Sequence, residues 1–218
     1  MKNERKYTML SLGDSYTIGE AVTENETFAA QTIALLNNDN ITFTKPTIIA
    51  KTGWTTDELA DAIKVWEEHN PESFKKNSGE VFVTLLIGVN NEFRGRSTEE
   101  YRKEFKDLLN TALQYAGGKV KHVFVLSIPD WGATPFAAED PKQRTPALIG
   151  NEIDQFNAIN KEEALKVKAH YIDITSISRQ TKQHPDFIAS DGLHPSGKMY
   201  AEWAKLLAPE MKKVITRQ

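Results

Sequence analysis

Hydrophobic residues are distributed along the chain in two kinds of segment. The first kind is a short, nearly continuous apolar run, which predicts a strand buried on both faces, as in the middle of a parallel sheet. Four such runs cover residues 7–12, 47–50, 81–87 and 120–128, and a shorter run at 169–172 is a candidate fifth strand.

The second kind of segment carries apolar residues at helical spacing and lies between or after these runs. Such segments cover residues 27–37, 56–69, 98–115, 151–167 and 196–214. The alternation of strand and helix predicts an α/β sandwich built from βαβ units with right-handed crossovers. We expect one domain spanning residues 1–218, because no segment rich in Gly, Pro or Ser divides the chain. A long irregular loop is expected at 129–150, where four prolines interrupt the pattern.

Composition and charge narrow the range of functions. The 27 basic and 30 acidic residues leave a net charge of −3 and form no long basic run, so we expect no nucleic-acid partner. The chain has no cysteine, which excludes disulfides, thiolate metal sites and a cysteine nucleophile. No run approaches about 20 apolar residues, so no transmembrane segment is predicted. Nothing in the sequence indicates the oligomeric state.

The N-terminal residues 1–6 are charged and lead directly into the first predicted strand. They include no separate apolar stretch with a small-residue cleavage site, as a secretory signal would. We therefore expect a cytoplasmic protein. A signal peptide removed before the present residue 1 would leave the same N-terminus.

Residues able to do chemistry follow the predicted strands. In parallel α/β sheets, ligands bind outside the carboxyl ends of the strands. The residues at these ends are Asp14 and Ser15 after the first strand, Gly53 after the second, Asn90 after the third, and Asp130 after the fourth. The loop before the last helix adds Asp191 and His194. The pattern predicts that these groups gather at one edge of the sheet.

Ser15 stands where a strand turns into a helix, and a helix N-terminus favours developing negative charge. Asp191 is three residues before His194, so its carboxylate can accept Nδ1–H of the imidazole while Nε2 takes a proton from a hydroxyl. The Ser15 and Gly53 N–H groups and the Asn90 side-chain amide are candidate oxyanion donors. Each feature also has a structural interpretation: a helix cap, a strand end or an ordinary turn.

Four short blocks in order, Gly13-Asp14-Ser15, Gly53, Gly88-Val89-Asn90 and Asp191-x-x-His194, resemble those of the SGNH (GDSL-type) hydrolases over nearly the whole chain. The resemblance implies a flavodoxin-like three-layer α/β/α fold with a central parallel sheet of about five strands. It also implies a serine esterase without metal or organic cofactor. Ser15 would be the nucleophile and an oxyanion donor, Gly53 and Asn90 further donors, His194 the base and Asp191 its orienting acid.

One position departs from the family pattern. The third block is most often Gly-x-Asn-Asp, whereas Asn91 stands here in place of the acid. The donor position is kept, so we interpret Asn91 as the mark of a subfamily. Asp14 is interpreted as an acid that holds the turn and has no chemical role.

The other histidines are not expected to take part. His184 precedes a proline as His194 does, but position 181, three residues before it, is a threonine, so we interpret it as a loop residue. The remaining histidines lack metal-ligand spacing, and we expect no metal site.

The side chains that follow the strand ends suggest a pocket. We hypothesise that they bind the acyl or alcohol part of a substrate, whereas Arg94 is more simply a solvated side chain. The candidates are Trp54, Phe93, Asp130 and Trp131, with Phe136 farther along the same loop.

The predicted function is hydrolysis of a small or short-chain carboxylic ester, a small-molecule substrate, through an acyl-enzyme. Acetylated carbohydrate, lysophospholipid, thioester and small aliphatic ester all remain open as substrates. An acyltransferase with the same triad is one alternative. A non-catalytic flavodoxin-like binding module is another, although the chain lacks the glycine-rich phosphate-binding motifs.

Overall fold

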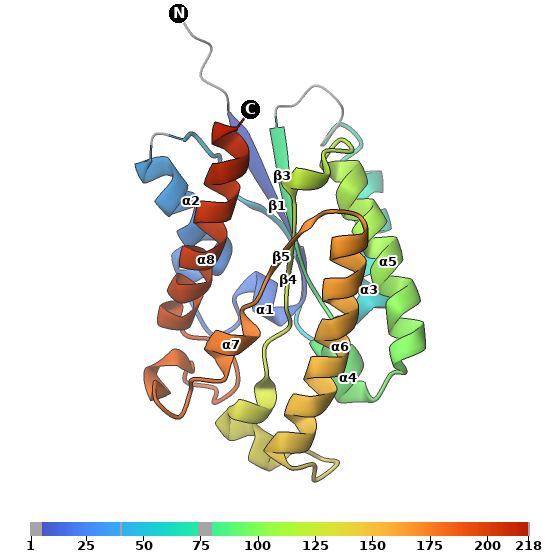
Figure 1. The fold of residues 1–218 in the computed structure, drawn as a ribbon, viewed down its shortest axis with the longest axis vertical. Coiled ribbons are helices and arrows are strands. Elements are labelled where there is room, and N and C mark those ends of the chain that lie inside the picture. Colours follow the sequence, from blue (N-terminus) through green and yellow to red (C-terminus); the bar gives the residue numbers. More distant parts are fainter. Residues whose placement is uncertain (1–5, 40, 74–79, 218) are drawn as a thin grey trace, which may run out of the picture.

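The computed structural model describes residues 6–39, 41–73 and 80–217 (Figure 1). Its centre is a five-stranded, all-parallel sheet in the order β2-β1-β3-β4-β5. The strands are β1 (Tyr7–Gly13), β2 (Thr47–Ala50), β3 (Glu80–Leu86), β4 (Val123–Leu126) and β5 (His170–Ile172). The predicted fold class is therefore confirmed. Of the charged N-terminus discussed above, only Lys6 lies within the described residues.

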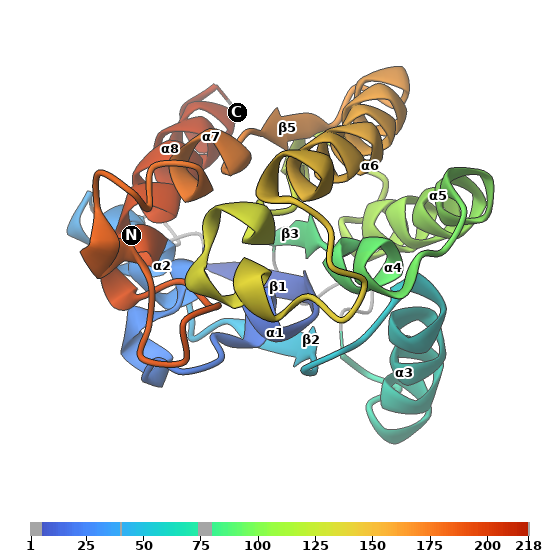
Figure 2. The ribbon, with the colours of Figure 1, turned by 90° about the horizontal axis from the view of Figure 1, so that it is seen from below.

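Helices cover both faces of this sheet (Figure 2). The helices α2 and α8 pack together on one face, whereas α3, α5 and α6 pack side by side on the other. The helices are α1 (Ser15–Ile18), α2 (Phe28–Asn38), α3 (Thr56–His69), α4 (Val89–Arg94), α5 (Thr98–Tyr115), α6 (Pro146–Lys166), α7 (Thr175–Ser178) and α8 (Gly197–Thr216). None of these described helices is long and apolar enough to cross a membrane.

The largest error of the sequence prediction concerns the start of α6, which begins at Pro146 and not at residue 151. Thr145 caps this helix by accepting the Leu148 N–H at 3.2 Å, and a proline suits the first helical position because its fixed φ is helical and its missing N–H is not needed. The expected loop is correspondingly shorter, and it contains the 3₁₀ turns Trp131–Ala133 and Pro135–Glu139. Residues 120–122, expected as strand, also form a 3₁₀ turn.

The strand order reverses between β1 and β3, because β2 lies on one side of β1 and all later strands lie on the other. Crevices for ligands open at such a reversal, outside the carboxyl ends of the strands. Here α1 follows β1 and α4 follows β3. Gly13 ends β1 beside Leu86, and a Cβ on it would lie 2.2 Å from Leu86 O and 2.1 Å from Thr17 Oγ1. Only glycine lets α1 begin so close to β3.

Candidate active site

A cavity of about 150 Å³ lies at the carboxyl ends of the strands, the end of the molecule that Figure 2 views. Ser15, Gly53, Asn90 and His194 all line it, although they come from four separate segments of the chain. The rest of the wall is largely apolar. It consists of Tyr16, Thr52, Val89, Phe93, Trp131, Phe136 and Leu193.

Ser15 is the first residue of α1 and is 4% exposed. Asp14 caps this helix by accepting the Tyr16 N–H at 3.0 Å. The Ser15 N–H, like the other first N–H groups of a helix, has no intrahelical acceptor and remains available to a ligand. Tyr200 on α8 donates its hydroxyl to Tyr16 O at 3.0 Å, which fixes α1 against the C-terminal helix.

The predicted acid–histidine pair is formed. His194 Nδ1 lies 2.6 Å from Asp191 Oδ2, and the Leu193 and His194 N–H groups donate to Asp191 Oδ1 at 3.0 and 2.9 Å. Partial burial alone would raise the pKa of Asp191, but these hydrogen bonds outweigh it and lower the pKa below its usual value. Because an ionised carboxylate can only accept, Nδ1 must carry the hydrogen, and Nε2 is left as the basic atom.

The loop that carries this pair is held in one shape by its own backbone. Ala189 N–H donates to His194 O at 2.8 Å, Ser196 N–H donates to Phe187 O at 2.7 Å, and Ile188 forms an antiparallel bridge with Pro195. The imidazole packs against the Tyr16 ring at 5.2 Å between centroids. The ring is thus oriented from the loop and from α1 together.

The three candidate oxyanion donors come from three strand ends. Besides the Ser15 N–H, the Gly53 N–H has no acceptor among the described residues, and Gly53 takes a positive φ of 85°. Asn90 donates one amide hydrogen to Trp54 O at 3.0 Å, and its Nδ2 lies 3.5 Å from Asp14 Oδ2. These contacts hold the amide at the cavity wall. Its second hydrogen makes only the long contact to Asp14, and a developing oxyanion would have to draw that hydrogen away from the carboxyl.

Asp14 is fully buried, and burial raises its pKa to about 7 against the opposing hydrogen bonds from Tyr16 N–H and Asn90. The folded state therefore binds a proton more tightly than the unfolded chain does. Between about pH 4 and pH 7 this carboxyl makes folding progressively less favourable as the pH rises. Above pH 7 the penalty is complete and amounts to as much as about 4 kcal/mol.

We expect the variant Asp14→Asn to lose this part of the pH dependence. Urea unfolding between pH 4.5 and 8 should show that the free energy of unfolding falls more steeply with pH in the wild type than in Asp14→Asn. The exposed acid Asp61, which among the described residues pairs with Lys64, supplies a control, and Asp61→Asn should keep the wild-type slope. Parallel profiles for wild type and Asp14→Asn would show that Asp14 is not the titrating group.

Asn91, the departure from the family pattern, lies away from the cavity. Its Oδ1 accepts the Thr56 N–H at 3.1 Å, and its Nδ2 donates to Thr56 Oγ1 at 2.6 Å. The Thr56 hydroxyl in turn donates to Glu104 on α5. An aspartate at position 91 could only accept, so it would compete with Glu104 for the hydrogen of the Thr56 hydroxyl. The Asn91 amide donates to Thr56 Oγ1 instead, which leaves the hydroxyl hydrogen for Glu104. The substitution therefore serves the packing of α3, α4 and α5.

Two of the side chains expected in the pocket are not on its wall. The Asp130 carboxylate accepts the Gly132 N–H at 2.9 Å and Arg179 Nε at 2.8 Å, which turns it into the protein. Trp54 contributes its carbonyl to Asn90 but does not line the cavity. The structure thus does not bring these two side chains to the cavity wall, and a sequence does not show which way a side chain points in an irregular loop. Phe93 and Trp131 do line the cavity.

The sequence analysis missed four lining residues, Tyr16, Thr52, Val89 and Leu193. Each is the immediate neighbour in sequence of a predicted site residue. In short turns and first helical turns, adjacent residues can reach the same cavity, so adjacency was the signal that could have found them.

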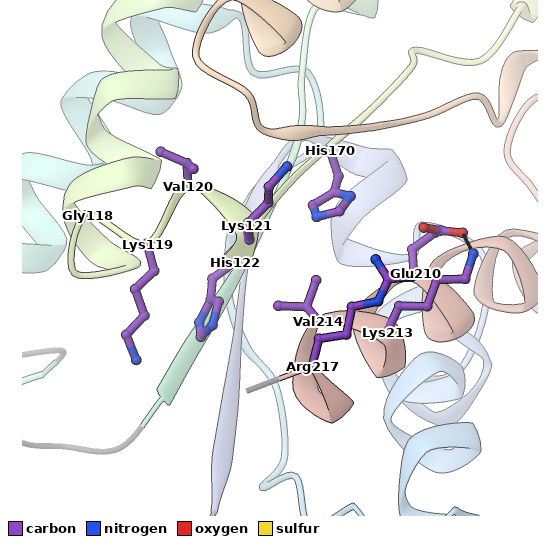
Figure 3. A pocket seen from close by; sticks show the side chains of 10 residues that line it. All are labelled: Gly118, Lys119, Val120, Lys121, His122, His170, Glu210, Lys213, Val214 and Arg217. Carbon is purple, nitrogen blue, oxygen red and sulfur yellow. Dashed lines mark hydrogen bonds and ion pairs between the residues drawn. The ribbon is translucent and has the colours of Figure 1, made fainter.

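A larger cavity of about 780 Å³ lies at the opposite end of the sheet, between the start of β4 and the last turns of α8 (Figure 3). His122 and His170 line it, but their rings stack on Phe82 and Phe124 at 4.1 and 4.5 Å, and burial lowers the pKa of both. No serine or threonine is among its lining residues. The small cavity is therefore the candidate active site.

The remaining predictions about histidines and metals concern other parts of the molecule. His184 stacks on Phe187 at 4.8 Å and does not line the small cavity, so His194 and not His184 shares that cavity with Ser15. Among residues 6–39, 41–73 and 80–217, no three His, Asp or Glu side chains come together as a metal site.

Sequence comparison identifies the family. A family model described as the GDSL-like lipase/acylhydrolase family matches residues 11–202. The chain belongs to this family. The matched segment of this GDSL-like chain includes Ser15, Gly53, Asn90, Asp191 and His194. No curated protein sequence matches it significantly.

Solved structures share the fold of this GDSL-like chain at low identity. A family 3 carbohydrate esterase from Clostridium thermocellum is 17% identical, with a TM-score of 0.70 and 98% of each chain covered. The lipase Lip_vut3 from a goat rumen metagenome is 20% identical, with a TM-score of 0.70 and 94% of this chain and 97% of that one covered. The esterase EstA from Pseudoalteromonas, in a structure inhibited by monoethylphosphonate, is 14% identical, with a TM-score of 0.66 and 96% and 98% covered.

Proposed function

We propose that this GDSL-like chain hydrolyses short-chain carboxylic esters through an acyl-enzyme. The observation that carries the proposal is that Ser15 and His194 line one cavity. Behind the imidazole, Asp191 binds His194 Nδ1 at 2.6 Å. That contact leaves Nε2 as the basic atom of a ring that lines the same cavity as Ser15. Three N–H donors from separate strand ends line or border this space.

The chemistry follows from these positions. His194 Nε2 takes the Ser15 hydroxyl proton while Oγ attacks the ester carbonyl, and the Ser15, Gly53 and Asn90 donors bind the resulting oxyanion. The imidazolium, stabilised by Asp191, then protonates the leaving alcohol as the carbon–oxygen bond breaks. Water, deprotonated by His194, attacks the acyl-serine by the same route and releases the acid and free Ser15.

The size and lining of the cavity limit the acyl group. A cavity of about 150 Å³ accommodates a molecule about as large as benzene, which has six heavy atoms. Aromatic side chains from Phe93, Trp131 and Phe136 line it, with edge-to-face contacts of Trp131 at 5.4 and 6.2 Å. We infer an acyl group of about two to six carbons. An acetyl group is within this range.

A series of p-nitrophenyl esters from acetate to dodecanoate tests the proposal. We expect kcat/KM to be highest between two and six carbons and to fall by at least about tenfold at ten carbons or more. An ethyl p-nitrophenyl phosphonate should inactivate the protein and appear on Ser15 in peptide mass spectra. Absence of turnover on every ester would favour the binding-module alternative.

The variant Phe136→Ala tests whether this cavity limits the length of the acyl chain. Phe136 lines the cavity but its side chain forms no hydrogen bond, so its removal should open the wall without disturbing Ser15 or His194. The optimum should move toward longer acyl chains while acetate turnover stays within about twofold. An unchanged profile would mean that this cavity does not hold the acyl group.

A further inference from the structure

Arg94, expected from the sequence to be solvated, contacts the backbone of the loop that supplies Gly53. Its Nη2 donates to Gly53 O at 2.6 Å, and its Nη1 lies 3.2 Å from both carboxylate oxygens of Glu58. The guanidinium is thus held by an anion on one side and binds a peptide carbonyl on the other. Because the fork of Arg is planar and rigid, fixing one nitrogen also fixes the direction of the other.

Gly53 needs such support, because its own turn holds it weakly. Residues 51–54 form a turn closed by one hydrogen bond, from Trp54 N–H to Lys51 O at 3.3 Å, and Gly53 has a positive φ of 85°. The backbone dihedral angles of glycine are less restricted than those of any other residue, so the direction of the Gly53 N–H depends on contacts from outside the turn. Arg94 Nη2, 3.8 Å from where a Cβ would lie, is the atom that covers Gly53.

The same short helix also carries the other side-chain donor. Asn90 is one turn before Arg94 on α4, and it binds Trp54 O while Arg94 binds Gly53 O. Two consecutive carbonyls of the oxyanion loop are therefore fastened to one helix. The spacing between the Gly53 N–H and the Asn90 amide is set by these two contacts.

We propose that Arg94 is a positioning residue that holds the Gly53 N–H toward the oxyanion, an inference that rests on the proposed ester hydrolysis. Oxyanion donors bind the transition state more strongly than the substrate, so a displaced donor lowers kcat and leaves KM nearly unchanged. An arginine that bound an anionic substrate group would instead affect KM.

The test compares Arg94→Met, Arg94→Lys and Arg96→Ala on p-nitrophenyl acetate. Arg96 pairs with Asp57 and Glu100 near the same end of α4 but does not reach Gly53 or Trp54, so it is the matched control. We expect kcat to fall about tenfold in Arg94→Met, with KM within about twofold of wild type. Arg94→Lys keeps one donor and should recover part of kcat, whereas Arg96→Ala should stay within about twofold of wild type.

A thionoester of the same acid provides a measurement that would not change if Arg94 only stabilised the fold. Sulfur accepts hydrogen bonds from N–H donors more weakly than oxygen, so the ratio of ester to thionoester rates reports on the oxyanion donors. This ratio should fall in Arg94→Met and not in Arg96→Ala. Unchanged kcat and ratio, or a rise in KM alone, would overturn the role of Arg94 while leaving esterase activity intact. An inactive wild type would overturn the proposed function itself.

Discussion

Replacing Ser15 by alanine is expected to lower kcat by about 10⁵- to 10⁶-fold, because no acyl-enzyme can form without Oγ. Turnover of p-nitrophenyl acetate at substrate saturation measures the effect, with an active-site titration of the wild type to give the enzyme concentration. The donors from Gly53 and Asn90 remain in place, so a small rate above that of water should persist. Loss of phosphonate labelling should accompany the loss of turnover.

The same variant should fold as the wild type does. Asp14 caps α1, and Tyr200 fixes α1 through Tyr16 O, so neither support depends on the serine hydroxyl. Thermal unfolding should therefore move by less than about 2 °C. Turnover in Ser15→Ala within tenfold of wild type would refute the nucleophile assignment and, with it, the proposed mechanism.

The variant Asp191→Asn is expected to lower kcat by about 10⁴-fold. The amide can donate as well as accept, so it no longer requires Nδ1 to carry the hydrogen, and it cannot stabilise the imidazolium that forms during attack. KM should change little, because Asp191 does not line the cavity. Steady-state kinetics on p-nitrophenyl acetate separate kcat from KM.

Asp186→Asn is the matched control for Asp191→Asn. Asp186 lies five residues upstream, next to the other His-Pro pair, and its carboxylate pairs at 2.8 Å with the exposed Lys198 within the described part of the chain. Its removal should change kcat by less than about twofold. A comparable loss in both variants would indicate damage to the loop and not to the acid–histidine pair.

The sequence predicted helices and strands best where the type of residue alone constrains the backbone. The helix 98–115 has the predicted bounds because Ser97 accepts the Glu100 N–H at 3.1 Å, as its position before two acids suggests. The three central strands β1, β3 and β4 are almost entirely buried, and apolar runs are the sequence signal of such strands. The edge strands β2 and β5 are only partly buried. Strand ends in turn placed Ser15 and Asn90 at one edge of the sheet.

Features that depend on side-chain direction were not predictable. Arg94 was expected to face solvent and Asp130 to face a ligand, yet Arg94 binds a backbone carbonyl and Asp130 binds Arg179. The helices α1 and α4 have four and six residues, too few to show helical periodicity. Pro146 was interpreted as a loop residue because a proline marks both loops and helix starts, and only the Thr145 cap distinguishes the two.

The contacts between α1, α2 and α8 join residues that are far apart in the sequence, so the cavity cannot form until all three helices have been synthesised. Besides the bond from Tyr200 to Tyr16 O, Gln31 on α2 donates to Gly197 O at 2.9 Å, so the first and last helices of the fold assemble the cavity together. During synthesis on the ribosome, Ser15 emerges well before His194. A nascent chain or fragment that lacks His194 would carry Ser15 without the base of the proposed mechanism, and we expect it to be inactive.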